Sequence, residues 1–167
     1  MYVYHGASNR IEKATPTRHK RTKKGTDGSQ QTIFDDISFH ATPHYWIALA
    51  YTYAIQTFRF SDQEIYYNIC VDLYKNTKEI TIHGYKSLEK SFEALYGNGG
   101  YIHTFYNNSF YHTKGLGTME CITKEIMEPL SISYIVNPVQ QMKALGVRFK
   151  FLDLSLERNK NKRNIKG

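Results

Sequence analysis

The amino-acid sequence predicts an α+β fold made of many short strands and about three helices. Short apolar stretches recur along the chain, and most of them are too brief for a helix but suit strands. Apolar residues at helical spacing are confined to three segments, one of them near the start of the chain. Helices and strands do not alternate regularly, which argues against the doubly wound parallel sheet that βαβ repeats produce. We therefore expect short sheets rich in antiparallel pairs.

The first forty residues are expected to form two short strands separated by a long loop. Residues 1–5 form the first strand, which needs a central partner to hold it in place. Residues 14–32 lack large apolar side chains and contain one proline and two glycines, a composition typical of a long mobile loop. Residues 37–40 form the second strand.

A helix is predicted to begin directly after this second strand. Thr42 is placed to cap it, and Pro43 suits its first position, where the missing N–H costs no hydrogen bond. Apolar residues from Ile47 to Phe58 recur with a spacing that gives the helix one buried face.

The remaining chain is expected to hold two more helices between further strands. A helix over residues 86–95 ends at the glycine-rich residues 97–100, and Asn137 and Pro138 start a short helix that Gly146 closes. The expected strands cover residues 64–74, 79–83, 101–106 and 118–123, lie within 126–136, and end with 149–152, with a polar loop over 107–117.

The length of 167 residues favours one domain, which we place over residues 1–153, followed by a basic, disordered tail over 154–167. No apolar run approaches the length of about 18 residues that a membrane span requires. The first residues do not have the basic start and long apolar stretch of a signal peptide. We therefore expect no membrane association and a cytoplasmic protein, or one delivered by a route that the sequence does not show.

The net charge of +7 is concentrated in two places. Without the five basic residues of 18–24 and the five of 158–166, the chain has 12 basic and 15 acidic residues, or about −3. Loop 18–24 and tail 158–166 can hold nucleic acid through its phosphates. The alternative interpretation is a solvated loop and tail that keep the protein soluble.

Several well-known site motifs are missing from the sequence. It contains no glycine-rich phosphate loop, no nucleophile elbow and no metalloprotease helix. His40 and His44 are four residues apart, but the Pro43 segment between them does not align them on one helix, so we expect no metal site. Cys70 and Cys121 lie in apolar stretches, which predicts two buried free thiols.

Three short segments form the pattern that points to function. The first is Tyr4-His5-Gly6-Ala7-Ser8, a strand that ends in His-Gly. The second is the strand-to-helix segment from Ser38 to Pro43, which is followed by several tyrosines. The third is a late apolar strand with a single carboxylate, Glu120.

In this order the segments resemble the ADP-ribosyltransferase superfamily, in its diphtheria-toxin-like branch with a His, Tyr, Glu signature. The chain looks most similar to small bacterial members such as rifampicin ADP-ribosyltransferase. The resemblance covers about residues 2–136 and depends on three short segments. It implies an ADP-ribosyltransferase-like split of two short antiparallel-rich sheets, with NAD⁺ as co-substrate.

The resemblance also implies roles for the first two segments. His5 would bond a ribose hydroxyl, and the backbone of Gly6 would hold the nicotinamide carboxamide, since glycine lets a flat ring approach the main chain. Ser8 and Thr42 would also contact the cofactor. The family stacks nicotinamide on tyrosine, and here Phe39, Tyr45, Tyr51 and Tyr53 are open alternatives for that stacking.

Glu120 is expected to carry the chemistry. Cleavage of the nicotinamide–ribose bond creates an oxocarbenium-like transition state that a nearby carboxylate stabilises. The same group can help to activate the incoming nucleophile. Glu125 and Glu128 are alternatives, and so is an outward-facing Glu120 without function. His5 and Glu120 are therefore the two expected catalytic residues.

Three functions follow as alternatives from the sequence. The first is an NAD-dependent ADP-ribosyltransferase that modifies a protein, a nucleic acid or a small molecule. The second is an NAD hydrolase or an RNA 2′-phosphotransferase on the same fold. The third is a non-enzymatic nucleic-acid-binding module that uses loop 18–24 and tail 158–166.

Overall fold

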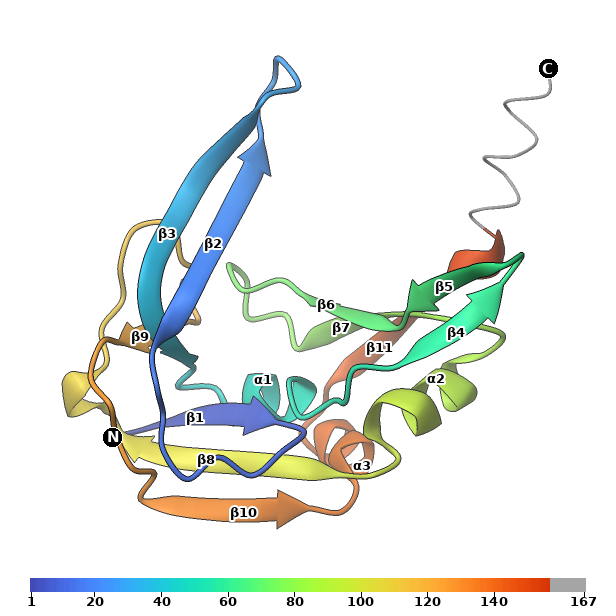
Figure 1. Cartoon of the computed structure of the whole chain (residues 1–167). Helices are drawn as coiled ribbons and strands as arrows, with labels where there is room; N and C mark the ends of the chain where they lie inside the picture. The colour runs from blue at the N-terminus through green and yellow to red at the C-terminus, as the bar shows by residue number, and fades with distance from the viewer. Residues whose placement is uncertain (157–167) are drawn as a thin grey trace.

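The computed structural model describes residues 1–156, and Figure 1 shows how their elements are arranged. The disordered tail expected over 154–167 starts too early, because residues 154–156 are helical and Ser155 is buried; the basic tail 158–166 lies outside the described residues. The fold is α+β, as expected, with small and mostly antiparallel sheets. The described residues form three three-stranded sheets and a two-stranded hairpin, rather than the two sheets expected. Two of those sheets pack around the main core, and the third forms an arm.

The first sheet contains the opening strand and two late strands. Strand β8 (Gly100–Tyr106) lies in the centre, between β1 (Tyr2–Ala7) and β10 (Ser131–Ile135). Both neighbours run antiparallel to β8, and His5 lies opposite His103. The expectation that the first strand needs a central partner is confirmed.

The second sheet has β7 (Glu79–Gly84) at its centre. Strand β6 (Asn68–Val71) pairs with it antiparallel, and the last strand, β11 (Arg148–Asp153), pairs with it parallel. The strand expected over residues 64–74 is interrupted. Its first part is β5 (Gln63–Tyr66), which forms a hairpin with β4 (Thr57–Phe60).

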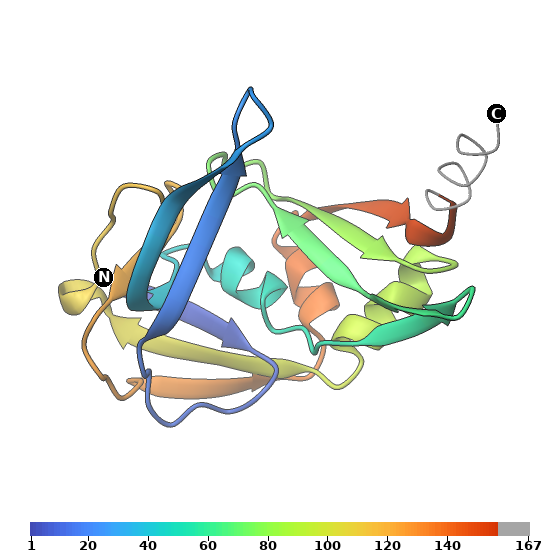
Figure 2. The same cartoon turned by 45° about the horizontal axis from the view of Figure 1, so that its top comes forward.

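The third sheet corrects the expectation of a loop over residues 14–32. Strands β2 (Thr17–Lys24) and β3 (Gln30–Ala41) form a long antiparallel hairpin, and β3 also pairs with the short β9 (Cys121–Thr123). The hairpin of β2 and β3, which we call the arm, projects beyond the other elements in both views (Figures 1 and 2). Its glycines occur only at the tip, where Gly28 adopts a positive φ of 83°. Pairing with β3 makes β2 a strand, although β2 contains no apolar residue.

The first helix is shorter than expected and begins later. Helix α1 (Tyr45–Ala50) follows His44, so Thr42 is not its cap and Pro43 is not its first residue. Thr42 instead forms an extended backbone pair with Tyr4, with N–H···O distances of 2.8 and 2.9 Å. That pair joins β1 to the end of β3 and prevents an earlier helix start. Phe58 lies in β4, outside the helix.

The other two helices agree closely with the sequence. In α2 (Leu88–Tyr96), the Ser87 hydroxyl accepts the N–H of Lys90. In α3 (Pro138–Ala144), Asn137 caps the helix, proline takes the first turn, and Gly146 follows with a φ of 79°. A 3₁₀ turn (Asn107–Ser109) follows β8.

The main core lies between α1, the first sheet and the second sheet. Its fully buried side chains come from both sheets and all three helices, among them Leu49, Ile80, Leu95, Ile102 and Met142. A smaller cluster packs β1 against β3 and β9 and contains Val3, Phe39, Ala41, Phe105 and Cys121. Because Tyr4 of β1 and Phe151 of β11 both pack against the main core, the first and last strands stabilise each other.

Two further findings concern the described part of the chain as a whole. Among residues 1–156, no helix combines the length and the apolar character that crossing a membrane requires. Both cysteines are free thiols, but only Cys121 is buried; Cys70 is exposed, so the expectation for it was wrong. In β6 its neighbour Ile69 faces the core, and the alternation of a strand turns Cys70 outward.

Candidate active site

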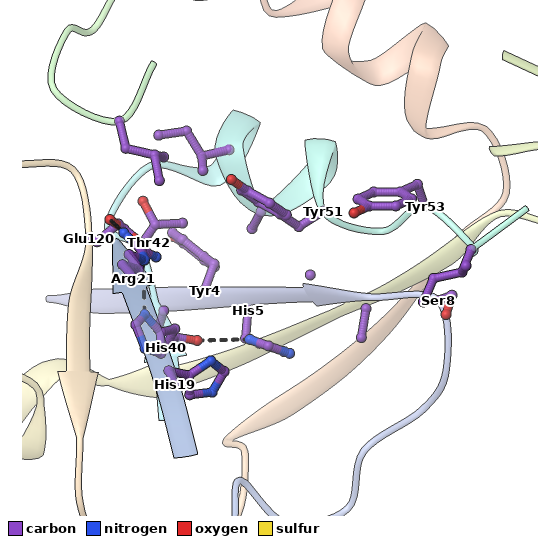
Figure 3. A pocket seen from close by; sticks show the side chains of 17 residues that line it. Tyr4, His5, Ser8, His19, Arg21, His40, Thr42, Tyr51, Tyr53 and Glu120 are labelled. Atoms are coloured by element: carbon purple, nitrogen blue, oxygen red, sulfur yellow. Dashed lines mark hydrogen bonds and ion pairs between the residues drawn. The ribbon is translucent and has the colours of Figure 1, made fainter. Parts of the chain in front are cut away.

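A cavity of about 410 Å³ lies where β1, the arm and α1 meet (Figure 3). Both residues expected to be catalytic line it, together with two of the expected tyrosines. The lining side chains and backbone belong to Tyr4, His5, Gly6, Ala7, Ser8, His19, Arg21, His40, Ala41, Thr42, Ile47, Ala48, Tyr51, Tyr53, Ile55, Leu73 and Glu120.

His5 lies on the β1 wall as a neutral imidazole. Its Nδ1 donates a hydrogen bond to the backbone oxygen of His40 at 2.8 Å, which leaves Nε2 as an acceptor. Burial lowers the pKa of His5 to about 4, although the bond to His40 opposes the shift. The ring packs against Phe39, with 4.4 Å between the ring centroids. A fixed, uncharged acceptor therefore faces the cavity.

His103 supports the backbone of His5 from the neighbouring strand. It is fully buried, its Nδ1 donates to the oxygen of His5 at 3.2 Å, and its Nε2 accepts the N–H of Ile11 at 2.8 Å. Both bonds require the neutral ring, and burial lowers the pKa of His103 as well. The paired histidines thus hold the end of β1 rigidly.

Gly6 lines the cavity, and the structure gives a reason for glycine here besides the expected approach of a ligand ring. A Cβ atom at Gly6 would lie 1.8 Å from the backbone oxygen of Ala48 in α1. Glycine is therefore required for the close packing of β1 on α1. Ser8 lines the far end of the cavity, beside Tyr53 (Figure 3).

Glu120 lies one residue before β9, at the end of a tight turn, and not within the strand expected over 118–123. Its N–H bonds the oxygen of Gly117 at 3.0 Å, and the N–H of Gly117 donates to Glu120 Oε2 at 2.9 Å. A Cβ at Gly117 would lie 2.5 Å from the Leu73 side chain, so this turn also depends on a glycine. The carboxylate is held by the turn and has a relative exposure of only 8%.

Arg21 of the arm binds Glu120 with two hydrogen bonds. Its two terminal nitrogens lie 2.6 and 2.5 Å from Oε2 and Oε1. Burial alone would raise the pKa of Glu120, but the neighbouring His40 ring, Arg21 and the Gly117 N–H outweigh it and lower the pKa to about 2. Glu120 is therefore an anion whose charge is matched by one guanidinium.

Two more histidines surround this ion pair. His40 Nδ1 lies 3.7 Å from Glu120 Oε1, beyond hydrogen-bond range, and has no hydrogen-bond partner among residues 1–156. Its Nε2 lies 3.3 Å from the Ser38 hydroxyl. The His19 ring packs edge-on against it, with 4.4 Å between centroids. A small movement of the His40 ring would thus bring Nδ1 into hydrogen-bond range of the Glu120 carboxylate.

The structure separates the expected aromatic residues into two groups. Tyr51 and Tyr53 line the cavity, whereas Phe39 and Tyr45 do not. Phe39 is buried in the small core behind His5, and Tyr45 packs edge-on against Tyr4. Burial, followed by the charge of Glu120, raises the pKa of Tyr51 to about 12, so its phenol stays protonated. The placement of Phe39 and Tyr45 corrects their expected contact with the cofactor.

Thr42 is buried at the cavity wall, where its hydroxyl forms structural hydrogen bonds. Its hydroxyl donates to the oxygen of Met119 at 2.7 Å and accepts the N–H of His44 at 3.0 Å. It therefore ties the end of β3 to the residue before Glu120 and to the start of α1. The hydroxyl proton is used in these bonds, and one acceptor lone pair remains.

The sequence interpretation missed Arg21, His19 and His40. The first two were placed in a mobile loop, so no partner for Glu120 was sought there. Thr17, His19 and Arg21 occur at every second position, and that period of two was the available signal for a strand face.

The alternative carboxylates lie outside the cavity. Glu125 accepts a hydrogen bond from the Ser109 hydroxyl, and Glu128 lies 3.9 Å from Lys13. Residues 107–117, the expected polar loop, do not line it either. Within the described range, no group of His, Cys, Asp and Glu residues is arranged to hold a metal ion.

Comparison with family models, with curated proteins and with solved structures finds no match to this chain.

Proposed function

We propose that this chain is an NAD-dependent ADP-ribosyltransferase, which transfers ADP-ribose to an acceptor and releases nicotinamide. The observation that carries the proposal is that His5 and Glu120, 115 positions apart in the sequence, line one cavity. For the third element of the signature, a tyrosine after the second segment, Tyr51 and Tyr53 are both candidates, since both line the same cavity.

His5 suits the recognition of a ribose hydroxyl. Its Nδ1 proton is fixed on the His40 oxygen, so Nε2 presents a lone pair to a hydroxyl donor. A lowered pKa keeps that lone pair free at neutral pH. The neutral ring also avoids repulsion of the cationic nicotinamide, whose flat face can stack on Tyr51 or Tyr53.

Glu120 suits the stabilisation of a positive transition state. Its pKa of about 2 means that it is ionised at any working pH. A fixed anion in a partly buried site stabilises the developing charge on the ribose more strongly than water does. The Gly117 N–H and the turn hold the carboxylate before the substrate arrives.

The Arg21 ion pair has to open during the reaction. A guanidinium that binds both carboxylate oxygens cancels the field that the oxocarbenium ion requires. Arg21 is the sole Lys or Arg that lines the cavity within the described chain. An anion that bound Arg21 in place of Glu120 would free the carboxylate.

The proposed reaction balances without a further reagent. The bond between ribose C1′ and the nicotinamide nitrogen breaks, and its electron pair leaves with nicotinamide, which becomes neutral. A lone pair of the acceptor forms the new bond to C1′. The acceptor proton goes to solvent.

The test is release of nicotinamide from NAD⁺ by purified protein, with and without cell extract. We expect Glu120→Gln to lower the rate by about 10²–10⁴-fold, because an amide keeps the shape but loses the charge. Glu125→Gln, an exposed carboxylate outside the cavity, is the matched control and should keep the wild-type rate. Equal rates for wild type and Glu120→Gln would refute the proposed role.

The products separate the alternative functions. Labelled ADP-ribose on a macromolecule or a small molecule supports transfer, whereas free ADP-ribose alone indicates a hydrolase. Removal of a 2′-phosphate from RNA with consumption of NAD⁺ would indicate a phosphotransferase. A protein that binds nucleic acid but never consumes NAD⁺ would be a binding module, and the enzyme proposal would fail.

A further inference from the structure

The arm carries an array of basic side chains next to the cavity. Strand β2 has five Lys and Arg residues among eight. Two of them are paired: Arg18 binds Asp35 at 2.9 Å, and Arg21 binds Glu120. The other three, Lys20, Lys23 and Lys24, are exposed and form no ion pair among residues 1–156. The uncompensated positive charge of the arm is thus concentrated on one strand.

The same strand forms a wall of the cavity. His19 and Arg21 point inward, while Lys20 between them is exposed. The acidic residues of the arm offset only part of this charge. Asp35 pairs with Arg18 and lies opposite Lys20, Asp36 pairs with Lys124 at 2.8 Å, and Asp27 lies at the tip.

By strand alternation Lys23 shares the face of Arg21, while Lys20 and Lys24 point to the opposite face. Because β2 is the edge of its sheet, an anionic polymer that follows this edge could contact both faces and would pass beside the cavity.

An exposed aromatic ring near Arg21 favours nucleic acid over an acidic peptide. Tyr74 does not line the cavity and has a relative exposure of 58%, so NAD⁺ in the cavity would leave its face free. It lies close enough to Arg21 to contribute to the raised pKa of that guanidinium, after the larger effect of Glu120. Lysines for phosphates beside open ring faces for bases are the two components of single-strand binding sites, whereas peptide carboxylates need no ring.

The ion pair between Arg21 and Glu120 connects this surface to catalysis. The Arg21 side chain has a relative exposure of 33%, so an incoming anion can reach it. A phosphodiester offers the same two-oxygen geometry as a carboxylate. A phosphate that binds Arg21 would leave Glu120 unpaired and ready to act.

We propose that the acceptor is a single-stranded nucleic acid that lies along β2, and that its backbone takes Arg21 from Glu120 and so starts NAD⁺ cleavage. The inference rests on the proposed transferase function. A base or sugar N–H or O–H attacks C1′, nicotinamide leaves with the bonding electrons, and the released proton goes to solvent. Without the nucleic acid the carboxylate stays locked, which limits wasteful hydrolysis.

The first experiment measures nicotinamide release and label transfer with 20-nucleotide single-stranded RNA and DNA of mixed sequence. We expect the oligonucleotide to raise nicotinamide release at least tenfold in the wild type. The triple variant Lys20→Gln, Lys23→Gln, Lys24→Gln should lose this increase and bind the oligonucleotide at least tenfold more weakly. Its plot of log affinity against log salt should be shallower by about 2, at about 0.7 per lost phosphate contact.

The matched control removes three lysines elsewhere. Lys86, Lys90 and Lys143 are exposed and lie on or beside α2 and α3, which are remote from the arm in Figures 1 and 2. Their replacement by glutamine changes the net charge equally. Equal loss of stimulation in both triple variants would overturn the inference, because it would assign the effect to overall charge.

A second experiment tests the lock, by which we mean the inhibition of NAD⁺ cleavage by the ion pair between Arg21 and Glu120. Arg21→Gln should lower the ratio of nicotinamide release with and without oligonucleotide to near one. Arg21→Lys keeps a charge but loses the two-oxygen geometry, so it should lower the ratio partly. This variant also tests the lock if the glutamine variant does not fold. An unchanged ratio in the folded variants would overturn the lock.

The two proposals fail differently. A wild-type protein that cleaves NAD⁺ at the same rate with and without oligonucleotide, and modifies a protein instead, refutes only the nucleic-acid acceptor. A wild type that never releases nicotinamide under any of these conditions refutes the transferase function and this inference together.

Discussion

His5 acts in the proposed mechanism as an acceptor, so its protonation should abolish its contribution. Because burial places its pKa at about 4, the neutral form persists well below the usual range of histidine near 6.5. We predict that NAD⁺ affinity stays constant from pH 8 to about pH 5.5 and falls as the pH approaches 4. Calorimetric titrations across this range measure it.

The control for this pH dependence is His5→Gln, which cannot gain a proton. Its affinity should be weaker than that of the wild type at pH 7 but should show a smaller change on acidification. A wild-type affinity that already halves near pH 6.5 would contradict the buried, neutral state of His5.

Tyr51 is the ring that the structure places beside Glu120. We predict that Tyr51→Ala weakens NAD⁺ binding by about tenfold, since stacking of a cation on an aromatic face contributes about 1 kcal/mol or more. Tyr51→Phe keeps the face and should keep most of the affinity. Tyr66→Ala, an exposed tyrosine of β5 outside the cavity, is the comparison variant. If Tyr51→Ala binds like the wild type, the stacking role belongs to Tyr53.

At the scale of single residues, the sequence predicted members of the site where a short segment contains the signal. His5 stands before Gly6 at a strand end, and Glu120 is the one carboxylate of an apolar stretch. Arg21 could not be predicted in this way, because its partner is 99 residues away and only the paired arm brings them together. Phe39 and Tyr45 were misplaced, since the direction of a side chain depends on where the strand ends and the helix begins.

At the scale of elements, the packing of β1 on α1 depends on Gly6. We predict that Gly6→Ala destabilises the fold by about 3 kcal/mol, because its Cβ meets backbone that cannot rotate away. Denaturant unfolding measures the loss. Gly28→Ala at the arm tip has no atom within 4 Å and is strained only by its φ of 83°, so it should cost about 1 kcal/mol.

Both variants change the unfolded chain in the same way, so the difference between them isolates the clash. Similar losses for Gly6→Ala and Gly28→Ala would mean that β1 and α1 can move apart freely. In that case the cavity wall would not be rigid.

Among the elements, those with caps or clear periods were predictable. The caps of α3 and the strands near residues 79–83 and 101–106 are confirmed. The arm was not, because β2 lacks the apolar alternation by which a half-buried strand is identified. Its stability comes from the ladder with β3 and from pairs such as Arg18–Asp35, neither of which a local pattern contains.

At the scale of the whole molecule, buried titratable groups should determine the acid stability. His5, His19 and His103 have lowered pKa values, so their neutral forms favour the folded state. Each contribution is complete above the unfolded pKa of about 6.5 and is lost as the pH falls toward the folded pKa. For His5 the window is pH 6.5 to about 4, and the loss is about 3 kcal/mol at most. Glu120 adds a second window, from about pH 4.5 to about 2.

Urea unfolding at a series of pH values measures this dependence. His5→Gln should lower the slope of unfolding free energy between pH 6 and 4.5 by up to about 1.4 kcal/mol per pH unit, the value for one proton. His83→Gln, a half-buried histidine of β7 outside the cavity, is the matched control. A wild-type stability that is flat from pH 7 to 4 would contradict the burial of these rings.

The sequence predicted the α+β class of the whole molecule, but not the number of sheets. The bridge between Tyr4 and Thr42 and the parallel pair of β7 with β11 both join segments far apart in the chain. Such long-range pairs have no local signal, so the division of the strands into three sheets follows only from the folded arrangement.

The contrasting surroundings of the two cysteines provide a chemical tool. Burial raises the pKa of Cys121 to about 12, which leaves almost no thiolate there, whereas Cys70 is exposed on β6. Maleimide dyes should therefore attach to a single position without mutagenesis. Cys70 lies near enough to Tyr51 to contribute to its raised pKa, so fluorescence from that dye can report when a ligand enters.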